Sequence, residues 1–199
     1  MQNNMATIKS LKKLLRKEMA NVISNITAEE KARQSMKVFE KLKTLPQYQN
    51  SQRISIYLST KDEIDTTFIL KDIFKTGKDV FVPRYNGDTM EMVKLLSMDD
   101  YDKLPLTKWN IKQPDISEIR ENSFQTDGLD LILIPGVAFT YNGKRLGHGK
   151  GYYDKFLNYT FEKQLRKPHL IAIAFNEQII DDIPTTENDV SIDLVITEK

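Results

Sequence analysis

The sequence of 199 residues contains no cysteine, which excludes disulfides, thiolate metal sites and cysteine nucleophiles. Its formal net charge is only +1, so no excess of one sign calls for nucleic acid or an anionic membrane. No apolar run approaches the roughly 20 residues of a membrane span. The first four residues also lack the charged-then-apolar pattern of a signal peptide. We therefore expect a cytoplasmic protein with no nucleic acid, no membrane and no obligate protein as a partner.

Apolar spacing along the chain alternates between helical and extended patterns. The length and the 40% hydrophobic content suit a single domain, residues 1–199. Spacings of three and four predict helices at 5–24, 27–45, 65–78 and 151–165, and compact apolar runs predict strands at 53–58, 79–84, 129–136, 169–175 and 193–197. This alternation predicts an α/β fold: a three-layer α/β/α single domain with a mostly parallel central sheet.

Local signals predict where some of these elements begin and end. Thr27, followed by Glu30, has the spacing of a capping box, and Asp65 is expected to cap the third helix. Pro83 is expected to close the second strand. Within residues 86–128 the run "MEMVKLL" favours a strand, and the rest is expected to be mostly loop.

In open sheets of this kind, ligands bind beyond the carboxyl ends of the strands. One of the segments that follow a predicted strand end is 141–156, "YNGKRLGHGKGYYDKF", which is rich in glycine, cations and tyrosine. Glycines before a helix allow backbone N–H groups to converge on a phosphate. The spacing fits neither a Walker A loop nor a Rossmann fingerprint. A solvated surface turn is the simpler alternative, and Asp154 fits either a helix cap or a Mg²⁺ ligand.

Six blocks of the chain, in order, resemble the 5-formyltetrahydrofolate cyclo-ligase family. The longest is "PGVAFTYNGKRLGHGKGYYDKFL"; the others include "YLSTKDEIDT", "VPRY", "WNIKQP", "LDLILIPG" and a closing P-x-x-x-N-D segment. The resemblance implies ATP-dependent cyclisation of 5-formyltetrahydrofolate to 5,10-methenyltetrahydrofolate. In that reaction the formyl oxygen takes the γ-phosphoryl group, N10 attacks the activated carbon, and ADP and phosphate are released. Phosphoryl transfer of this kind needs cations and Mg²⁺ more than covalent chemistry from the protein.

The resemblance also assigns roles to matching positions of this sequence. It implies catalytic roles for Arg145, His148 and Lys150, and Mg²⁺ ligands at Asp154 and Asp189. It implies ATP binding by Lys12, Arg16, Arg145, Gly147, His148, Gly149, Lys150, Gly151 and Tyr153. It implies folate binding by Leu58, Glu63, Trp109, His148 and Tyr152. His148 stands where family members commonly have arginine.

Several of these residues also have ordinary structural interpretations. Lys12 and Arg16, four residues apart, fit the solvated side of an amphipathic helix. Glu63 fits a surface acid, Trp109 a core anchor, and Asp189 a turn residue. Arg84 ends a predicted strand and is left outside the predicted site.

Two other functions use the same features. A nucleotide-binding regulator or RNA-binding module would use the basic loop without catalysis, although RNA readers usually carry a broad basic face. A small-molecule kinase would stop after phosphorylation, and only its product distinguishes it from a cyclo-ligase.

Overall fold

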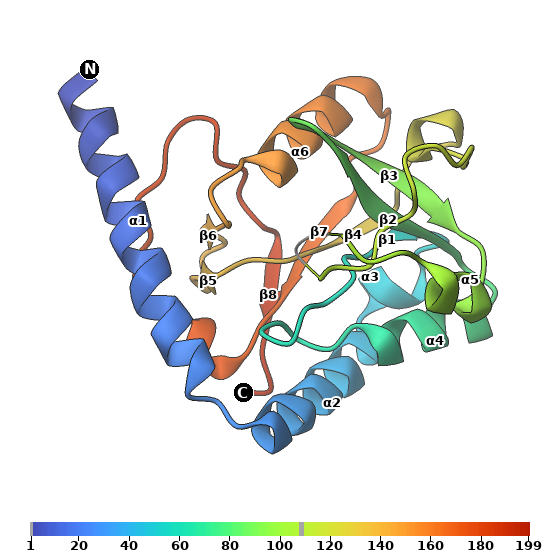
Figure 1. Ribbon diagram of the computed structural model, residues 1–199, viewed down its shortest axis with the longest axis horizontal. Helices are drawn as coiled ribbons and strands as arrows, with labels where there is room; N and C mark the ends of the chain where they lie inside the picture. Colours follow the sequence, from blue (N-terminus) through green and yellow to red (C-terminus); the bar gives the residue numbers. More distant parts are fainter. Residues whose placement is uncertain (1, 108–109) are drawn as a thin grey trace.

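Six strands form one sheet at the centre of the computed structural model, which describes residues 2–107 and 110–199 (Figure 1). The strand order is β3-β2-β1-β4-β7-β8, and every neighbouring pair is parallel except β2 and β3. The strands are β1 Arg53–Ser55, β2 Asp79–Asn86, β3 Thr89–Leu95, β4 Leu131–Ile134, β7 His169–Ile173 and β8 Leu194–Ile196. The predicted mostly parallel sheet is confirmed.

Helices cover both faces of this sheet. In Figure 1, α6 (Tyr152–Lys163) lies above it, while α2 (Ala28–Thr44) and α4 (Thr67–Lys75) lie below it. Strand β4 shows why two layers are needed: Leu131 and Leu133 pack in the core with α2 and α4, whereas Ile132 and Ile134 pack in the core with α6. A parallel strand buried on both faces is apolar at every position. The predicted three-layer α/β/α domain is confirmed.

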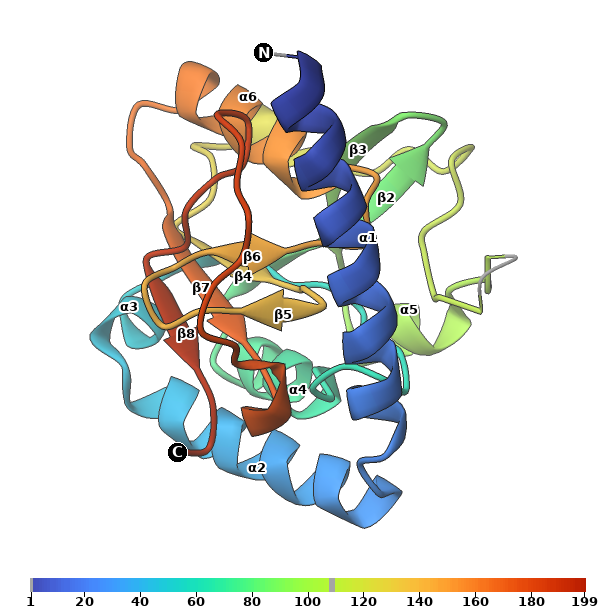
Figure 2. The same cartoon turned by 90° about the vertical axis from the view of Figure 1, so that its left-hand side faces the viewer.

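Helix α1 (Gln2–Ser24) stands outside these three layers. It packs through Met19 and Leu15 against Val137 and Leu146, on and beside the small antiparallel hairpin of β5 (Ala138–Phe139) and β6 (Arg145–Leu146). Figure 2 shows α1 running along this side of the molecule, next to the hairpin. The predicted helix is confirmed. Only part of its apolar face is covered by the rest of the protein, as the 45% exposure of Leu11 shows.

The strand order contains a reversal of direction that creates space for a ligand. From β1 the chain crosses through α4 to β2 on one side, and later returns to β4 on the other side of β1. The segments that follow β1 and β4 therefore diverge, and a crevice opens at their carboxyl ends. The remaining short elements are α3 Pro46–Gln49, α5 Met98–Lys103 and the 3₁₀ turns η1 Ser123–Gln125 and η2 Asn176–Gln178.

Two of the signals for where elements begin and end were misread. Helix α4 begins after Thr66 rather than Asp65, whose carboxylate accepts a hydrogen bond from the backbone N–H of Thr67 at 2.9 Å. Strand β2 does not close at Pro83 but runs on to Asn86 and pairs with β3 throughout. The carbonyl of Phe81 accepts a hydrogen bond from the backbone N–H of Ile56, so the backbone polar groups of Phe81 point toward β1. Pro83 lies two residues later, so its backbone nitrogen is on the same edge of the strand. No residue of β1 is paired there, so the missing N–H of Pro83 leaves no strand hydrogen bond unmade.

The first half of segment 141–156 is held firmly against the β8 side of the molecule. Gly143 has φ +89°, and its carbonyl accepts a hydrogen bond from the backbone of Ile192 at 2.9 Å. A Cβ at Gly143 would lie 2.3 Å from the carbonyl oxygen of Ile192. We therefore expect Gly143→Ala to lower the free energy of unfolding by roughly 2–4 kcal/mol, because it adds a backbone clash to an unfavourable φ.

Gly77 provides the matched control for this substitution. It has φ +70°, and a Cβ there would meet no atom within 4 Å. Gly77→Ala should therefore show only the cost of the backbone conformation, about 1–2 kcal/mol. Urea denaturation of both variants measures the difference, and equal losses would contradict the close contact at Gly143.

Among the described residues, no helix is long and apolar enough to cross a membrane. The cytoplasmic location stays a prediction from the sequence.

Candidate active site

A cavity of 1110 Å³ opens at the carboxyl ends of β1, β2 and β4, with α1 as one of its walls. Every predicted site residue that the structure describes lines this cavity: Lys12, Arg16, Leu58, Glu63, Arg145, Gly147, His148, Gly149, Lys150, Gly151, Tyr152, Tyr153, Asp154 and Asp189. Trp109, also predicted, lies outside the described residues. Residues far apart in the sequence are thus gathered where the topology predicts a ligand.

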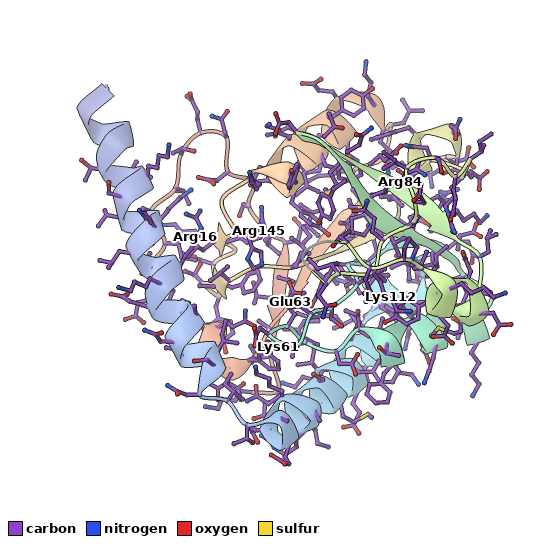
Figure 3. All side chains as sticks on the ribbon, in the orientation of Figure 1. Arg16, Lys61, Glu63, Arg84, Lys112 and Arg145 are labelled. Carbon is purple, nitrogen blue, oxygen red and sulfur yellow. The ribbon has the colours of Figure 1, made fainter. Side chains whose placement is uncertain are left out.

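Helix α1 brings two cations to the cavity. The Nζ of Lys12 donates to both carboxylate oxygens of Asp189, at 2.6 and 2.8 Å. One turn later, the Nε of Arg16 donates to the carbonyl oxygen of Gly147 at 2.7 Å. Figure 3 shows Arg16 reaching from α1 toward the segment that carries Arg145. Burial lowers the pKa of Arg16, and Asp189 partly offsets this. These contacts contradict a merely solvated role for the two side chains.

Arg145 and Asp154 form an ion pair in the cavity wall. Arg145 Nη2 donates to Asp154 Oδ2 at 2.8 Å, and the two side chains are 6% and 20% exposed. Asp154 Oδ1 accepts from the backbone of Val190 at 3.2 Å. The N-cap of α6 is Gly151, with no side-chain cap, so the alternative role of Asp154 as a helix cap is wrong. Among the residues that the structure describes, the buried Nε of Arg145 and the buried hydroxyl of Tyr153 have no hydrogen-bond partner.

Asp189 is the acceptor at the centre of a second cluster. Besides Lys12, the backbone N–H and the hydroxyl of Thr186 donate to its Oδ2, at 2.6 and 3.0 Å. Burial raises its pKa, but the hydrogen bonds from Lys12 and Thr186 lower it more, so the pKa of Asp189 lies below the ordinary 3.8. Asp189 is therefore a turn residue, as one interpretation of the sequence predicted, and it also lines the cavity.

The lowered pKa of Asp189 predicts a measurable contribution to acid stability. A carboxyl with a depressed folded-state pKa stabilises the fold above its unfolded pKa, and this contribution is lost as the pH falls through the folded value. We expect the free energy of unfolding to fall more steeply below pH 3.8 in the wild type than in Asp189→Asn. Urea titrations at stepped pH measure both slopes, and parallel curves would contradict the prediction.

Glycine-rich backbone and an uncapped helix start form the floor of the site. Gly149 has φ +99°, and a Cβ there would lie 3.3 Å from the guanidinium carbon of Arg16. No described side chain caps the first N–H groups of α6, and their partial positive charge attracts anions. Lys150 is exposed and, among the described residues, has no hydrogen-bond or ion-pair partner. This arrangement suits a phosphate chain.

The other end of the cavity carries an acid and apolar groups. Glu63 Oε2 accepts from the backbone N–H and the hydroxyl of Thr60, at 2.9 and 3.0 Å. Its Oε1 faces His148 Nε2 at 3.8 Å, and the side chain of Glu63 is 12% exposed whereas that of His148 is 69% exposed. Leu58 is buried beside them. Glu63 is therefore a fixed acceptor in the wall, which contradicts its interpretation as an ordinary surface acid.

Sequence reasoning missed several lining residues. Tyr57, two residues beyond β1, and Tyr85, near the end of β2, also line the cavity, and burial raises the pKa of both phenols. The rings of Tyr85 and Tyr152 lie 4.9 Å apart, and Tyr152 donates to the carbonyl oxygen of Gly87 at 2.8 Å. Gln113 bonds both backbone groups of Tyr85. Both tyrosines lie in blocks that resemble the family, "YLSTKDEIDT" and "VPRY", but no role was assigned to them.

Arg84 was left outside the predicted site, and its contacts agree. Its guanidinium pairs with Glu91 at 2.8 Å and donates to the carbonyl oxygens of Asp115 and Glu118, and it does not line the cavity. Figure 3 shows it well away from Arg16 and Arg145. Arg84 therefore anchors the 115–118 segment to β2.

Comparisons with known proteins identify the family. A family model described as the 5-formyltetrahydrofolate cyclo-ligase family matches residues 8–198. The chain belongs to this family. The 5-formyltetrahydrofolate cyclo-ligase of Mus musculus is 46% identical over 194 residues, covering 96% of each chain. A probable 5-formyltetrahydrofolate cyclo-ligase of Caenorhabditis elegans is 43% identical, covering 98% of this chain and 96% of its own.

A solved member of the cyclo-ligase family has the same fold. The 5,10-methenyltetrahydrofolate synthetase of Aquifex aeolicus superposes with a TM-score of 0.76 at 30% identity, covering 95% of this chain and 90% of its own. The resemblance seen in six short blocks therefore extends over nearly the whole chain.

Proposed function

We propose that this protein catalyses the ATP-dependent cyclisation of 5-formyltetrahydrofolate to 5,10-methenyltetrahydrofolate, with release of ADP and phosphate. Its membership of the cyclo-ligase family supports the activity. The observation that carries the proposal is the single cavity, in which a cationic, glycine-rich surface adjoins a wall with a fixed acid and tyrosine rings. Such a cavity suits a triphosphate next to a flat heterocycle.

Arg16, Arg145, His148 and Lys150 would surround the transferred phosphoryl group. In the first step the formyl oxygen bonds to the γ-phosphorus while the bond to the ADP oxygen breaks. Charge spreads over the phosphoryl oxygens in that transition state, and positioned cations stabilise it. The backbone N–H groups at the start of α6 would add donors that need no reorganisation. Lys12, on the same face of α1 as Arg16, would bind the phosphates of ATP that are not transferred.

In the second step N10 bonds to the activated carbon, the carbon–oxygen bond breaks, and phosphate leaves while N10 loses its proton. An amide oxygen is a poor leaving group, and phosphorylation converts it into a good one. The chain has to hold N10 close to that carbon and exclude water. Leu58, Glu63 and Tyr152 would hold the folate, with Glu63 Oε1 accepting from the pterin N–H groups; Tyr57 and Tyr85 would extend this wall. The role of Trp109 stays a prediction from the resemblance.

Asp154 and Asp189 would hold Mg²⁺ together with the triphosphate. Among the residues that the structure describes, no group of three or more His, Asp or Glu side chains is placed to hold a metal ion. The two carboxylates of Asp154 and Asp189 fit Mg²⁺, which usually takes one or two carboxylates and completes its shell with water and phosphate oxygens. Bound there, Mg²⁺ would neutralise phosphate charge. Ion pairs with Arg145 and Lys12 orient the two carboxylates.

A spectrophotometric assay for methenyltetrahydrofolate tests the proposal. Purified protein is mixed with 5-formyltetrahydrofolate, ATP and Mg²⁺, and each component is omitted in turn. We expect product only when all three are present. A stable phosphorylated folate without ring closure would indicate a kinase. No product from folded protein that still binds ATP would overturn the proposed activity, and the folate roles of Glu63 and Tyr152 with it.

A further inference from the structure

Strand β2 has an open edge where it reaches the cavity. Its last pairing with β1 is at Phe81, and beyond Phe81 no described residue of β1 pairs with this edge. The backbone polar groups of Phe81, Pro83 and Tyr85 all lie on it, because every second residue of a strand points the same way. An unpaired backbone group shielded from water is costly, so the N–H and the carbonyl of Tyr85 need another partner.

The carboxamide of Gln113 takes the place of a strand residue on this edge. Its Oε1 accepts a hydrogen bond from the backbone N–H of Tyr85 at 3.0 Å, and its Nε2 donates to the carbonyl oxygen of Tyr85 at 3.1 Å. Gln113 lies 28 residues from Tyr85 in the sequence, and both residues line the cavity. The side chain of Gln113 thus joins its own segment to the end of β2.

The segment that carries Gln113 is anchored on its other side by Lys112. The Nζ of Lys112 donates to the carbonyl oxygens of Tyr101 and Asp102 in the last turn of α5, both at 2.8 Å. Figure 3 shows Lys112 on the side of the molecule that carries α5, away from α1. Two anchors therefore fix this part of the cavity wall, one to α5 and one to β2.

We propose that Gln113 is a positioning residue for folate binding, which holds the ring of Tyr85 in place against Tyr152 by pairing with the backbone of Tyr85. The inference rests on the proposed function for the identity of the ligand. The two rings lie 4.9 Å apart at an interplanar angle of 56°, and both line the cavity. A wall that is already fixed binds more tightly, because no ordering cost is left for the binding step.

Gln164 makes the same pair of hydrogen bonds in another part of the protein. Its Oε1 accepts from the backbone N–H of Leu129 at 2.9 Å, and its Nε2 donates to the carbonyl oxygen of Leu129. Gln164 does not line the cavity. Gln164→Ala is therefore the matched control, because it removes two equivalent hydrogen bonds whose only role is to stabilise the fold.

Binding of two ligands tests this role without catalysis. Calorimetry measures the Kd of 5-formyltetrahydrofolate and, separately, of ADP with Mg²⁺ for the wild type and each variant. In Gln113→Ala we expect the Kd of 5-formyltetrahydrofolate to rise roughly tenfold and that of ADP to keep its wild-type value. Gln113→Glu keeps the size of the side chain but cannot donate to the carbonyl of Tyr85, so it should weaken folate binding as much. Gln164→Ala should lower the urea midpoint and leave both Kd values unchanged.

A double variant shows whether Gln113 acts through Tyr85. In the Tyr85→Ala background, Gln113→Ala should change the Kd of 5-formyltetrahydrofolate by no more than about twofold, because the ring that Gln113 positions is already gone. Losses that add in full would mean that Gln113 contacts the folate itself, and would overturn the positioning role.

Wild-type folate affinity in Gln113→Ala or Gln113→Glu, or an equal loss of affinity in Gln164→Ala, would also overturn the inference. Failure of the methenyltetrahydrofolate assay, with folate binding that still depends on Gln113, would overturn the proposed activity alone. No binding of 5-formyltetrahydrofolate to the folded wild type would overturn both.

Discussion

Replacing Lys150 with alanine is expected to lower the rate of methenyltetrahydrofolate formation by roughly 100- to 1000-fold, the cost of removing one donor that stabilises transition-state charge. Lys150 precedes the start of α6 and lines the cavity. Its ammonium is exposed and has no partner among the described residues, so its removal breaks no contact that the fold uses. The effect should therefore fall on kcat, with the unfolding midpoint unchanged.

Lys155→Ala is the matched control, because Lys155 is an exposed lysine of α6 that does not line the cavity. It should keep the wild-type rate. Lys150→Arg should recover part of the activity, since it restores a positive charge with a different geometry. Wild-type turnover in Lys150→Ala would remove this residue from the mechanism.

Asp154→Asn is expected to change two quantities that can be measured separately. The concentration of Mg²⁺ that gives half-maximal activity should rise by roughly 10- to 100-fold, because a neutral amide is a poor ligand for a hard cation. The free energy of unfolding should fall by roughly 1–3 kcal/mol, because Arg145, only 6% exposed, loses its carboxylate. Activity titrations with Mg²⁺ and urea denaturation without nucleotide give the two values.

These two effects distinguish a metal ligand from a residue that only holds Arg145. If Asp154 has the second role alone, stability falls while the Mg²⁺ requirement keeps its wild-type value. Glu162→Gln, which changes an exposed acid on the same helix outside the cavity, should alter neither quantity.

Periodicity predicted the layers of this fold because they follow from burial. Strand β4 had to be a central strand since all of its residues are apolar, and the structure buries each one. Pro83 misled the prediction of β2, because a proline interrupts a strand only where a partner needs its N–H. The β5–β6 hairpin could not be found in the sequence, since each strand has two residues and shows no alternation.

The residues of the candidate site also fall into two groups: those that a sequence motif identifies and those that only the folded structure places in the cavity. Arg145, Lys150 and Asp154 lie within ten positions of one another, and their motif can be recognised in the sequence. Tyr85 lines the cavity without an assigned role, and Gln113, 28 residues away in the sequence, bonds both of its backbone groups. The "VPRY" block that contains Tyr85 does not show which of its side chains lines the cavity.

The ion pair between Lys12 and Asp189 joins positions 177 residues apart. A chain growing on the ribosome therefore lacks part of the proposed phosphate site until its last strand is about to form, even when α2, α4 and the central strands have already assembled. Nucleotide binding would then stabilise only the finished protein, by an amount set by nucleotide concentration over its dissociation constant. Chains that end before residue 189 also lack β8, and they should gain no stability from ATP.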